Sequence, residues 1–507
     1  MVDTLTGYVD AWARHTPDAI VLSEAGTELG YAALQRRIDQ DAGRLRALGV
    51  ARGDRVALAG VNTIDWVCAF LGALRLGAVI VPLNSRLGAG QIRPLLDLLE
   101  PAVVLADDTQ EPLLESLPPG TVPVYRISGS GDMAGRFAHV RPEPLPPPDI
   151  RPEDPALLAF TSGTTGAPKA AIISHGSLLA SARSFRPHLR LTAASRTTVL
   201  VPLFHNTGYV DQLAHMIVVG GQVDLVRRFG RSDAITAMTR RPPDYLAMVP
   251  SILRMLMLTP EADTVFRDCT VIVLGGAALP AAWSAEMRAR WPEIRILSGY
   301  GLTEFTSGSH VLPAEMLGAH PDAVGYPLDG VGCTVRAVDG TPCRPGEPGE
   351  VWLRGPMRMT GYWRRPDATA AALSGEWLRT GDLGTVDADG LLRLHGRINQ
   401  VINRGGEKIL PGELEDLLSA SDAVAEVAVV GLPDPLLGER VAAAVVLKSG
   451  RRLDTGPLLR LLDGNVPDYA IPETVVAVDE LPRNPTGKVD RAGTAELLRH
   501  RADLSTT

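Results

Sequence analysis

Lysine is scarce in this chain of 507 residues, whereas arginine is common. Of the 50 basic residues, 46 are arginines and four are lysines, which are Lys169, Lys408, Lys448 and Lys488. The compact ammonium group of lysine binds phosphate as a point charge, whereas the arginine guanidinium is a planar fork. Where a chain with this preference uses lysine, we expect the ammonium group to serve a specific chemical purpose.

Cysteine and long apolar runs are also rare. The four cysteines, Cys68, Cys269, Cys333 and Cys343, lack the spacing of a metal site; Cys333 and Cys343 could pair, but a reduced cytoplasmic chain is expected. No run approaches 18 apolar residues and residues 1–20 lack a signal-peptide pattern, so no membrane association is expected. A net charge of −8 gives no support to nucleic-acid binding.

The first 150 residues alternate between helical and strand patterns. Helical spacing of apolar residues covers Tyr31–Ala47 and Asp65–Leu76, and the short apolar runs Arg55–Ala59 and Ala78–Pro82 are typical of strands. This alternation predicts an α/β fold with a doubly wound sheet. Because 507 residues are too many for a single core, two or more domains are expected.

The most informative stretch is the nine-residue loop Thr161–Lys169. It lies between two apolar runs of strand length, Ala156–Phe160 and Ala170–Ile173, and a helical pattern follows in Ser177–Phe185. The loop holds four hydroxyl side chains, two glycines and one lysine. Glycines let backbone N–H groups turn inward into an anion-binding nest, and hydroxyls and lysine add donors and charge. The spacing differs from that of a Walker A loop, but the composition predicts a phosphate-binding loop.

Three later segments carry small or polar residues directly after predicted strands. A strand predicted at Val199–Pro202 leads to an aromatic residue and a histidine, which suit the mouth of a pocket. The strand predicted at Val271–Leu274 runs into small residues that let a flat ring approach the backbone. A strand at Ile296–Leu297 precedes a motif that ends in Glu304, whose hard oxygen atoms suit Mg²⁺.

After residue 400 the alternation of patterns restarts. A helix is predicted at Glu413–Ala420, and strands are predicted at Val424–Gly431, Glu439–Leu447 and Thr474–Val478. These elements predict a small, separate α+β domain of about a hundred residues.

The loop and six further motifs, in this order along the chain, closely resemble the signature of the adenylate-forming superfamily, which includes acyl-CoA synthetases, adenylation domains and luciferase-like ligases. The six motifs are Pro202–Gly208, Gly275–Pro280, Tyr300–Glu304, Gly381–Asp382, Gly396–Glu413 and Asn484–Lys488. The resemblance implies a large N-terminal domain over residues 1–396, built of doubly wound sheets and a β-rich subdomain. It further implies a hinge at residues 397–400 and a mobile α+β C-terminal domain over residues 401–507 that carries the catalytic lysine.

The resemblance also implies a set of residues for ATP and Mg²⁺. In the loop, the residues expected to bind the nucleotide are Thr161, Ser162, Gly163, Thr164, Thr165, Gly166 and Lys169. Elsewhere they are Gly276, Ala277, Ala278, Ser298, Gly299, Tyr300, Gly301, Thr303, Asp382, Arg397 and Lys488. Catalytic roles are implied for Lys488, Glu304, Thr165 and Lys169, and Glu304 and Thr165 are the implied Mg²⁺ ligands.

A pocket for the acid and a loop for the second half-reaction follow from the same resemblance. The expected pocket residues are Phe204, His205, Asn206, Thr207, Tyr209, Val249, Ala277 and Thr306. The expected thiolation loop is Arg404, Gly405, Gly406 and Glu407, and Asn399 is the expected hinge residue, although the family usually has Asp or Lys there. Because no arginine is obvious among the pocket residues, an apolar aryl or acyl monocarboxylate is favoured over a dicarboxylate.

These features imply an ATP-dependent carboxylic acid–CoA ligase, an enzyme that uses ATP, Mg²⁺ and CoA as a co-substrate. Three alternatives remain at this point. The chain could pass its acyl group to an acyl carrier protein, it could serve another nucleophile or activate nitrite, or it could be a degenerate regulatory member of the family. The sequence does not distinguish a monomer from a homodimer.

Overall fold

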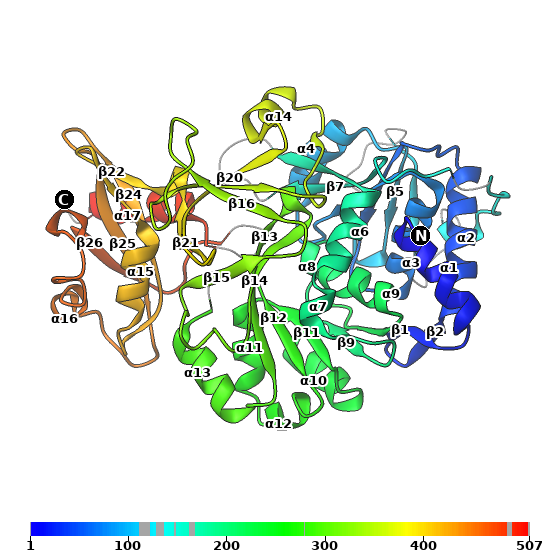
Figure 1. Cartoon of the computed structure of the whole chain (residues 1–507), viewed down its shortest axis with the longest axis horizontal. Coiled ribbons are helices and arrows are strands. Elements are labelled where there is room, and N and C mark those ends of the chain that lie inside the picture. The colour runs from blue at the N-terminus through cyan, green and yellow to red at the C-terminus, as the bar shows by residue number, and fades with distance from the viewer. Residues whose placement is uncertain are drawn as a thin grey trace. The chain divides into compact units, whose positions relative to one another are not determined.

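A computed structural model describes residues 2–110, 122–127, 136–146, 149–161, 168–277, 279–483 and 489–504 (Figure 1). The chain forms two compact units. The first extends to Thr161 and includes Pro168–Cys333 and Leu353–Leu378, and the second consists of Thr334–Trp352 and the chain from Arg379 onward. The predicted hinge at residues 397–400 lies within the second unit, and its role stays a prediction.

One sheet of the first unit has the strand order β18-β8-β7-β4-β3-β5-β6. Strands β3 to β7 pair in parallel, and the two edge pairs β7/β8 and β8/β18 are antiparallel. Helix α4 packs on one set of alternating residues of this sheet, and helix α3 contacts strands β3 and β4 as well. The strands are β3 (Arg55–Ala59), β4 (Val79–Leu83), β5 (Val103–Ala106), β6 (Val124–Arg126), β7 (Pro155–Thr161), β8 (Lys169–Ser174) and β18 (Gly361–Tyr362), and the helices around it are α2 (Tyr31–Ala47), α3 (Ile64–Leu76), α4 (Ala89–Leu99) and α6 (His175–Ser184).

A second series of strands in the first unit has the order β15-β14-β13-β12-β11-β9-β10-β1-β2. The strands from β1 to β13 in this series pair in parallel, whereas β2, β14 and β15 add antiparallel pairs. The parallel strands are rich in buried Val, Ile and Leu, as expected for strands covered on both faces. The strands are β1 (Ile20–Glu24), β2 (Thr27–Gly30), β9 (Arg196–Val199), β10 (Gln222–Leu225), β11 (Tyr245–Met248), β12 (Val271–Leu274), β13 (Arg295–Leu302), β14 (Ser307–Leu312) and β15 (Ala323–Pro327).

Helices alternate with these strands along the chain, so the predicted α/β fold is confirmed (Figure 1). The remaining helices of the first unit are α1 (Leu5–His15), α7 (Arg186–Leu189), α8 (Asn206–Gly208), α9 (His215–Val219), α10 (Arg231–Arg240), α11 (Pro250–Met257), α12 (Ala262–Val265), α13 (Ala281–Arg290) and α14 (Pro366–Ala372), together with a π-helical segment at Tyr209–Ala214.

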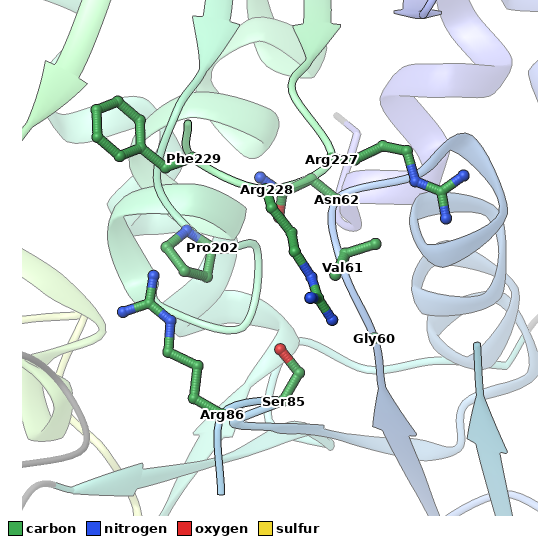
Figure 2. Close-up of a pocket in the computed structure, with 9 residues that line it drawn as sticks. All are labelled: Gly60, Val61, Asn62, Ser85, Arg86, Pro202, Arg227, Arg228 and Phe229. Atoms are coloured by element: carbon green, nitrogen blue, oxygen red, sulfur yellow. The ribbon is translucent and has the colours of Figure 1, made fainter. Parts of the chain in front are cut away.

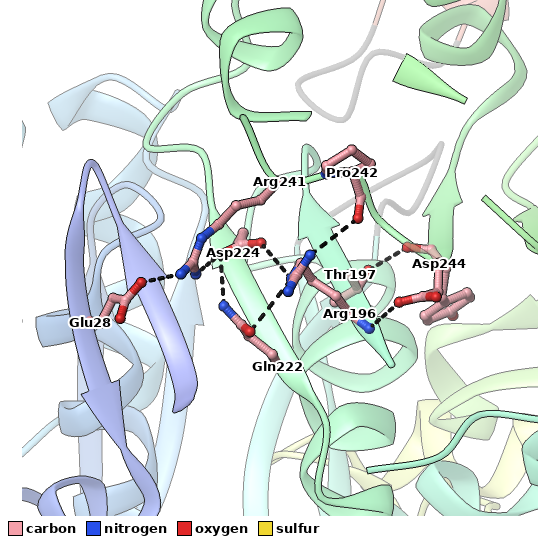
Figure 3. A network of polar contacts seen from close by, with 9 residues as sticks. Glu28, Arg196, Thr197, Gln222, Asp224, Arg241, Pro242 and Asp244 are labelled. Atoms are coloured by element: carbon pink, nitrogen blue, oxygen red, sulfur yellow. Dashed lines mark hydrogen bonds and ion pairs between the residues drawn. The ribbon is translucent and has the colours of Figure 1, made fainter. Parts of the chain in front are cut away.

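Charged side chains join the amino ends of two parallel strands (Figure 3). Arg196, the first residue of β9, lies 3.8 Å from a carboxylate oxygen of Asp224 and donates to Gln222 Oε1 at 3.4 Å. Arg241 follows α10, donates to Asp224 at 3.2 Å and also pairs with Glu28 of β2. This network stabilises one end of the sheet, whereas ligands of parallel sheets bind at the other end, where the strands terminate.

The second unit contains two groups of strands. In the first group, β17 (Gly349–Arg354) lies between β16 (Gly332–Arg336) and β20 (Trp377–Val386) in the strand order, and β20 pairs with β21 (Leu392–Arg397). The short strand β19 (Leu373–Ser374) belongs to the first unit and pairs with the first two residues of β20, Trp377 and Leu378. The second group is a sheet of β23 (Glu407–Ile409), β22 (Ile402–Arg404), β25 (Gly438–Leu447) and β24 (Val424–Asp434), with β26 (Thr474–Val478) beside β25.

The C-terminal sheet is covered on both faces. Val429 of β24 lies in one apolar cluster with Leu414 and Leu418 of helix α15 (Pro411–Ser419), whereas its neighbour Val430 lies in a second cluster with Leu498 of helix α17 (Arg491–Leu504). Since successive strand residues point to opposite faces, the two helices cover opposite faces of the sheet. With helix α16 (Thr455–Leu459), this confirms the predicted small α+β fold.

The strand predicted at Val199–Pro202 is wrong in its extent, because β9 ends at Val199. Beyond that residue, the side chain of Asn62 takes the place of a neighbouring strand. Its Nδ2 donates to the carbonyl oxygen of Val201 at 2.9 Å, and its Oδ1 accepts from the N–H of Leu203 at 2.7 Å. Pro202 has no N–H to offer to a ladder.

The strand predicted at Ile296–Leu297 extends through Leu302, because residues 298–302 pair with antiparallel strand β14. The predicted apolar run was therefore only part of the strand, which has further buried residues at Tyr300 and Leu302. All four cysteines are unpaired in the structure. Every helix in the part of the chain that the structure describes is too short or too polar to cross a membrane.

Candidate active site

The predicted phosphate-binding loop connects two antiparallel strands. Thr161 ends β7, Lys169 begins β8, and the two residues are direct partners in the pairing register. Strand pairing therefore holds the two ends of the loop next to each other. The predicted residues Ser162, Gly163, Thr164, Thr165 and Gly166 lie outside the described residues.

Tyr362 connects two of the predicted site residues. Its ring lies 5.5 Å from Lys169 Nζ, and its hydroxyl group donates a hydrogen bond of 2.7 Å to Glu304 Oε1. Strand β18 holds Tyr362 beside Ala171 of β8, and the 3₁₀ turn Thr303–Phe305 contacts both β7 and β8. Lysine, tyrosine and glutamate thus form one cluster next to the ends of the loop.

Glu304 fits a role at Mg²⁺, but only together with other ligands. One carboxylate oxygen accepts from Tyr362, and the other has no protein partner among the described residues. The described residues hold no group of three or more His, Cys, Asp or Glu that could bind a metal ion by themselves. Mg²⁺ in nucleotide sites usually has one or two carboxylates, with phosphate and water as its other ligands, and the single carboxylate present here agrees with that pattern.

The residues expected at the adenine follow the carboxyl end of β12, whose last residue, Leu274, pairs with Ser298 inside the parallel neighbour β13. Gly276 has a φ of +78°, which favours glycine, and its position is exposed, as is that of Ala277. A Cβ atom at Gly276 would lie 3.5 Å from Val249, so a residue expected at the acid is adjacent to one expected at the nucleotide. Ala278 lies outside the described residues.

Four further residues of the predicted nucleotide site lie on or next to β13. Gly299 and Tyr300 are inside the strand, and the Tyr300 ring is almost fully buried, 5.8 Å from the His310 ring. A bulge follows at Gly301, where a Cβ atom would lie 1.7 Å from the carbonyl oxygen of Ser307, so only glycine fits. Thr303 begins the 3₁₀ turn that carries Glu304.

Most residues predicted for the acid pocket lie in the segment after β9. The rings of Phe204 and His205 are 4.4 Å apart and tilted by 55°, and both are half-buried. Asn206 and Thr207 begin α8, and the buried Tyr209 donates its hydroxyl hydrogen to Asn206.

Thr306, the last of the predicted pocket residues, comes from a different element. It has a φ of +59°, and its hydroxyl group donates to the Met357 carbonyl oxygen at 2.5 Å. The next residue, Ser307, instead donates to Asp211 at 2.6 Å. Neither Asp211 nor Tyr362 was recognised as a site residue from the sequence, because both contacts join residues that are far apart in the chain.

In the second unit, strand pairing places Asp382 of β20 opposite Arg397 of β21. Arg397 Nε lies 2.7 Å from Asp382 Oδ1; the carboxylate is buried and the guanidinium is exposed. The ion pair therefore brings together two residues predicted to bind the nucleotide. Lys488, the predicted catalytic lysine, lies outside the described residues.

The predicted thiolation loop is a two-residue hairpin between β22 and β23, with Arg404 paired with Glu407. Gly405 and Gly406 have φ values of +63° and +98°, and two consecutive positive φ angles are typical of a tight hairpin turn. Arg404 forms an ion pair with Glu473, and Gly405 donates its N–H to the Leu437 carbonyl oxygen at 2.7 Å. Asn399, the predicted hinge residue, lies in a short 3₁₀ turn, Ile398–Gln400.

A pocket of about 330 Å³ lies where four parallel strands of the first unit end (Figure 2). Its lining comes from the residues after β3, β4, β9 and β10, and three of its residues are arginines: Arg86, Arg227 and Arg228. Arg227 lies 3.8 Å from both Glu24 and Asp108, whereas Arg86 and Arg228 form no ion pair with the described residues. Figure 2 shows the Arg228 side chain pointing toward Ser85. We call this the arginine pocket, and its charge suits an anionic ligand.

Comparisons with known proteins identify the family of the chain. The family model of the AMP-binding enzymes matches residues 9–363, and that of the AMP-binding enzyme C-terminal domain matches residues 413–488. The chain is similar to an indoleacetate–CoA ligase of Aromatoleum aromaticum, with 32% identity over 99% of this chain and 100% of that protein. It is also similar to a fatty acid–[acyl-carrier-protein] ligase, ScoC, of Streptomyces coeruleorubidus, with 30% identity over 97% of this chain and 95% of that protein. Among solved structures, the o-succinylbenzoate–CoA synthetase of Bacillus subtilis in complex with ATP and magnesium ion has a TM-score of 0.85 and 28% identity, and the match covers 96% of this chain and 98% of that one.

Proposed function

The chain belongs to the AMP-binding enzymes of the adenylate-forming superfamily, and we propose that it is an ATP-dependent carboxylic acid–CoA ligase. In the first half-reaction, the carboxylate of the acid attacks the α-phosphate of ATP, pyrophosphate leaves, and an acyl-adenylate forms. In the second, the thiol of CoA attacks the acyl carbon and AMP leaves. We propose an aryl or acyl monocarboxylate as the acid.

The first half-reaction has to bring two anions together, since a carboxylate and the phosphates of ATP repel each other. Aligned binding and fixed positive charge can offset this repulsion. The cluster of Lys169, Tyr362 and Glu304 supports such a role, because it joins a cation and a carboxylate beside the ends of the loop. When bound at Glu304, Mg²⁺ would neutralise phosphate charge. We assign contact with the reacting carboxylate and the α-phosphate to Lys488, on the resemblance of its motif.

The other nucleotide contacts are assigned in the same way. The Asp382–Arg397 pair supports a ribose site, because a buried carboxylate held by an arginine can accept from sugar hydroxyl groups. Gly276 and Ala277 are open to a flat base, and Val249 lies beside them on the acid side. For the second half-reaction we propose that the hairpin Arg404–Glu407 replaces Lys488 at the acid through rotation about Asn399.

The choice of CoA as the acceptor depends on one observation, the arginine pocket. The nucleotide end of CoA carries a pyrophosphate and a 3′-phosphate, whereas the arm of an acyl carrier protein carries a single phosphodiester. Three guanidinium groups around one pocket, two of them without an ion-pair partner among the described residues, match the more highly charged acceptor.

Pyrophosphate release from Mg-ATP tests this proposal. The panel of acids should contain aromatic, short, medium and long acyl, and dicarboxylic acids and nitrite, each with and without CoA and with products identified by mass. Formation of a CoA thioester from one of the acids is expected. An adenylate that persists in the presence of CoA would contradict the proposal, and it would favour the carrier protein or another nucleophile.

A further inference from the structure

One carboxyl group near the predicted acid pocket has no role in the reaction described above. Asp211 lies in the π-helical segment Tyr209–Ala214, which continues from the predicted pocket residues of α8. Ser307 of β14 donates its hydroxyl hydrogen to Asp211 Oδ1 at 2.6 Å. Tyr245 of β11 donates to the main-chain oxygen of Asp211 at 2.5 Å. Three elements that are distant in sequence therefore hold this residue in place.

The surroundings of Asp211 differ from those of an ordinary structural carboxylate. Protein surrounds it so completely that burial raises its pKa to about 7, opposed only by the hydrogen bond from Ser307. No described cation forms an ion pair with it, although buried carboxylates are normally paired. Asp211 nevertheless keeps some accessible surface as a residue, whereas Val210 and Gln212 on either side are buried. A residue that is surrounded by protein and still partly accessible is suited to border a ligand-binding space.

Residues predicted for the acid pocket are neighbours of Asp211 in two segments of the chain. Tyr209 lies two residues and Asn206 five residues before Asp211 along the chain, and Ser307 directly follows Thr306. From this placement we propose that Asp211 is a specificity-determining residue at the far end of the acid pocket. It selects carboxylic acids that carry a hydroxyl or amino group remote from the reacting carboxylate.

The chemistry of the carboxyl group determines this preference. An ionised carboxylate only accepts hydrogen bonds, and Ser307 occupies one of its acceptor positions. A substrate hydroxyl or amino group would supply a donor to the remaining positions. An apolar substrate end would displace water from the carboxylate without replacing its hydrogen bonds. Above pH 7, where the Asp211 carboxyl group is ionised, a second substrate carboxylate would meet a like charge, so dicarboxylates are disfavoured as well.

Sites that hydrogen-bond a substrate group reject the analogue without it by about 10⁴-fold or more in the strongest cases. Because Ser307 still satisfies one oxygen, we expect a smaller preference, about 10- to 100-fold in kcat/KM. The inference rests on the proposed function, since it concerns which acid that reaction accepts.

Matched pairs of acids test the inference on the full-length enzyme. Each pair has the same length and differs at one remote position: 4-hydroxybenzoate and 4-aminobenzoate against 4-methylbenzoate, 4-hydroxycinnamate against 4-methylcinnamate, and 6-hydroxyhexanoate against heptanoate. The readout is kcat/KM for pyrophosphate release. The wild type should favour the donor-bearing acid about 10-fold or more in the pair whose length fits.

Two variants identify the residue responsible. Asp211→Leu should reverse the preference in that pair, and the isosteric Asp211→Asn should reduce it without changing the overall shape of the site. Asp233→Asn, an exposed residue of α10, is the matched control and should leave the ratio unchanged. Thermal unfolding of each variant verifies that it is folded. If the Leu variant does not fold, the Asn variant still decides the test.

The possible failures are distinguishable. Equal use of both members of every pair by the wild type, or a ratio that the Asn variant leaves unchanged, would overturn the inference while leaving the ligase function intact. Absence of pyrophosphate release with every acid would overturn the proposed function, and the inference with it.

Discussion

Removal of the Tyr362 hydroxyl group is the most direct test of the proposed nucleotide site. The substitution Tyr362→Phe removes one oxygen atom, and with it the 2.7 Å hydrogen bond to Glu304 Oε1. The aromatic ring near Lys169 Nζ remains, because it does not depend on the hydroxyl group. The variant therefore tests the effect of the hydrogen bond that orients Glu304 while the ring beside Lys169 stays in place.

The size of the effect follows from the type of bond. A hydrogen bond to a charged group contributes about 1.5–3 kcal/mol, and the half-buried position of Tyr362 favours the lower end of that range. Since about 1.4 kcal/mol corresponds to a tenfold change, we expect kcat/KM for Mg-ATP to fall about 10-fold. Tyr362→Ala should cost more, because it also removes the ring from beside Lys169.

The assay is pyrophosphate release at varied Mg-ATP and then at varied free Mg²⁺, with a saturating acid. If Tyr362 orients the Mg²⁺ ligand, the phenylalanine variant should need more Mg²⁺ for half-maximal rate. Tyr125→Phe in β6, whose hydroxyl group forms no hydrogen bond with the described residues, is the control. An unchanged kcat/KM for Mg-ATP, together with an unchanged Mg²⁺ requirement, would refute the reasoning.

Three further predictions concern other parts of the chain. Lys488→Ala should abolish adenylate formation but leave thioester formation from supplied acyl-adenylate largely intact, and equal loss of both half-reactions would disprove the role of Lys488. Arg228→Glu should raise the KM for CoA about 10-fold by reversing a charge in the arginine pocket, with little change in the KM for ATP, whereas Arg240→Glu on the exposed face of α10 should change neither. Because the pKa of Asp211 is about 7 in the folded protein, against 3.8 as its ordinary value, its contribution to stability decreases as pH rises through 7. Tyr209 and Tyr245 stay neutral between pH 5 and 8, and the His215 ring does so as well because its pKa is about 4. Over this range the melting temperature of the wild type should therefore fall relative to that of Asp211→Asn. The same dependence of melting temperature on pH in both proteins would contradict this.

Local sequence pattern was enough to predict elements whose bounds are not altered by contacts with distant residues. Arg55–Ala59 and Val271–Leu274 are strands with the predicted bounds, because strands buried on both faces appear as short uninterrupted apolar runs. The hairpin at Arg404–Glu407 was not predicted as a hairpin, although its two consecutive glycines agree with the turn that the structure has there. In each case the residues that determine the structure are next to one another in the chain.

Contacts between distant residues account for what the sequence did not reveal. The end of β9 depends on Asn62, about 140 residues earlier, and no pattern near residue 200 indicates that side chain. The contacts of Tyr362 with Glu304 and of Ser307 with Asp211 also join distant residues. A tyrosine after glycine or an aspartate in an apolar segment has no distinctive local pattern, and only the folded chain gives each its partner.

The position of Asn62 has a consequence for communication between the two ligand sites. Its amide group donates to the Val201 and Val226 carbonyl oxygens at 2.9 and 3.0 Å and accepts from Leu203. One rigid side chain therefore anchors both the segment that leads to Phe204 and His205 and the segment that leads to Arg227 and Arg228. If the two segments hold the acyl group and the acceptor as proposed, a ligand that orders one segment is expected to restrict the other through this shared anchor. By thermodynamic linkage such a dependence would be reciprocal, so each substrate would change the affinity for the other without touching it.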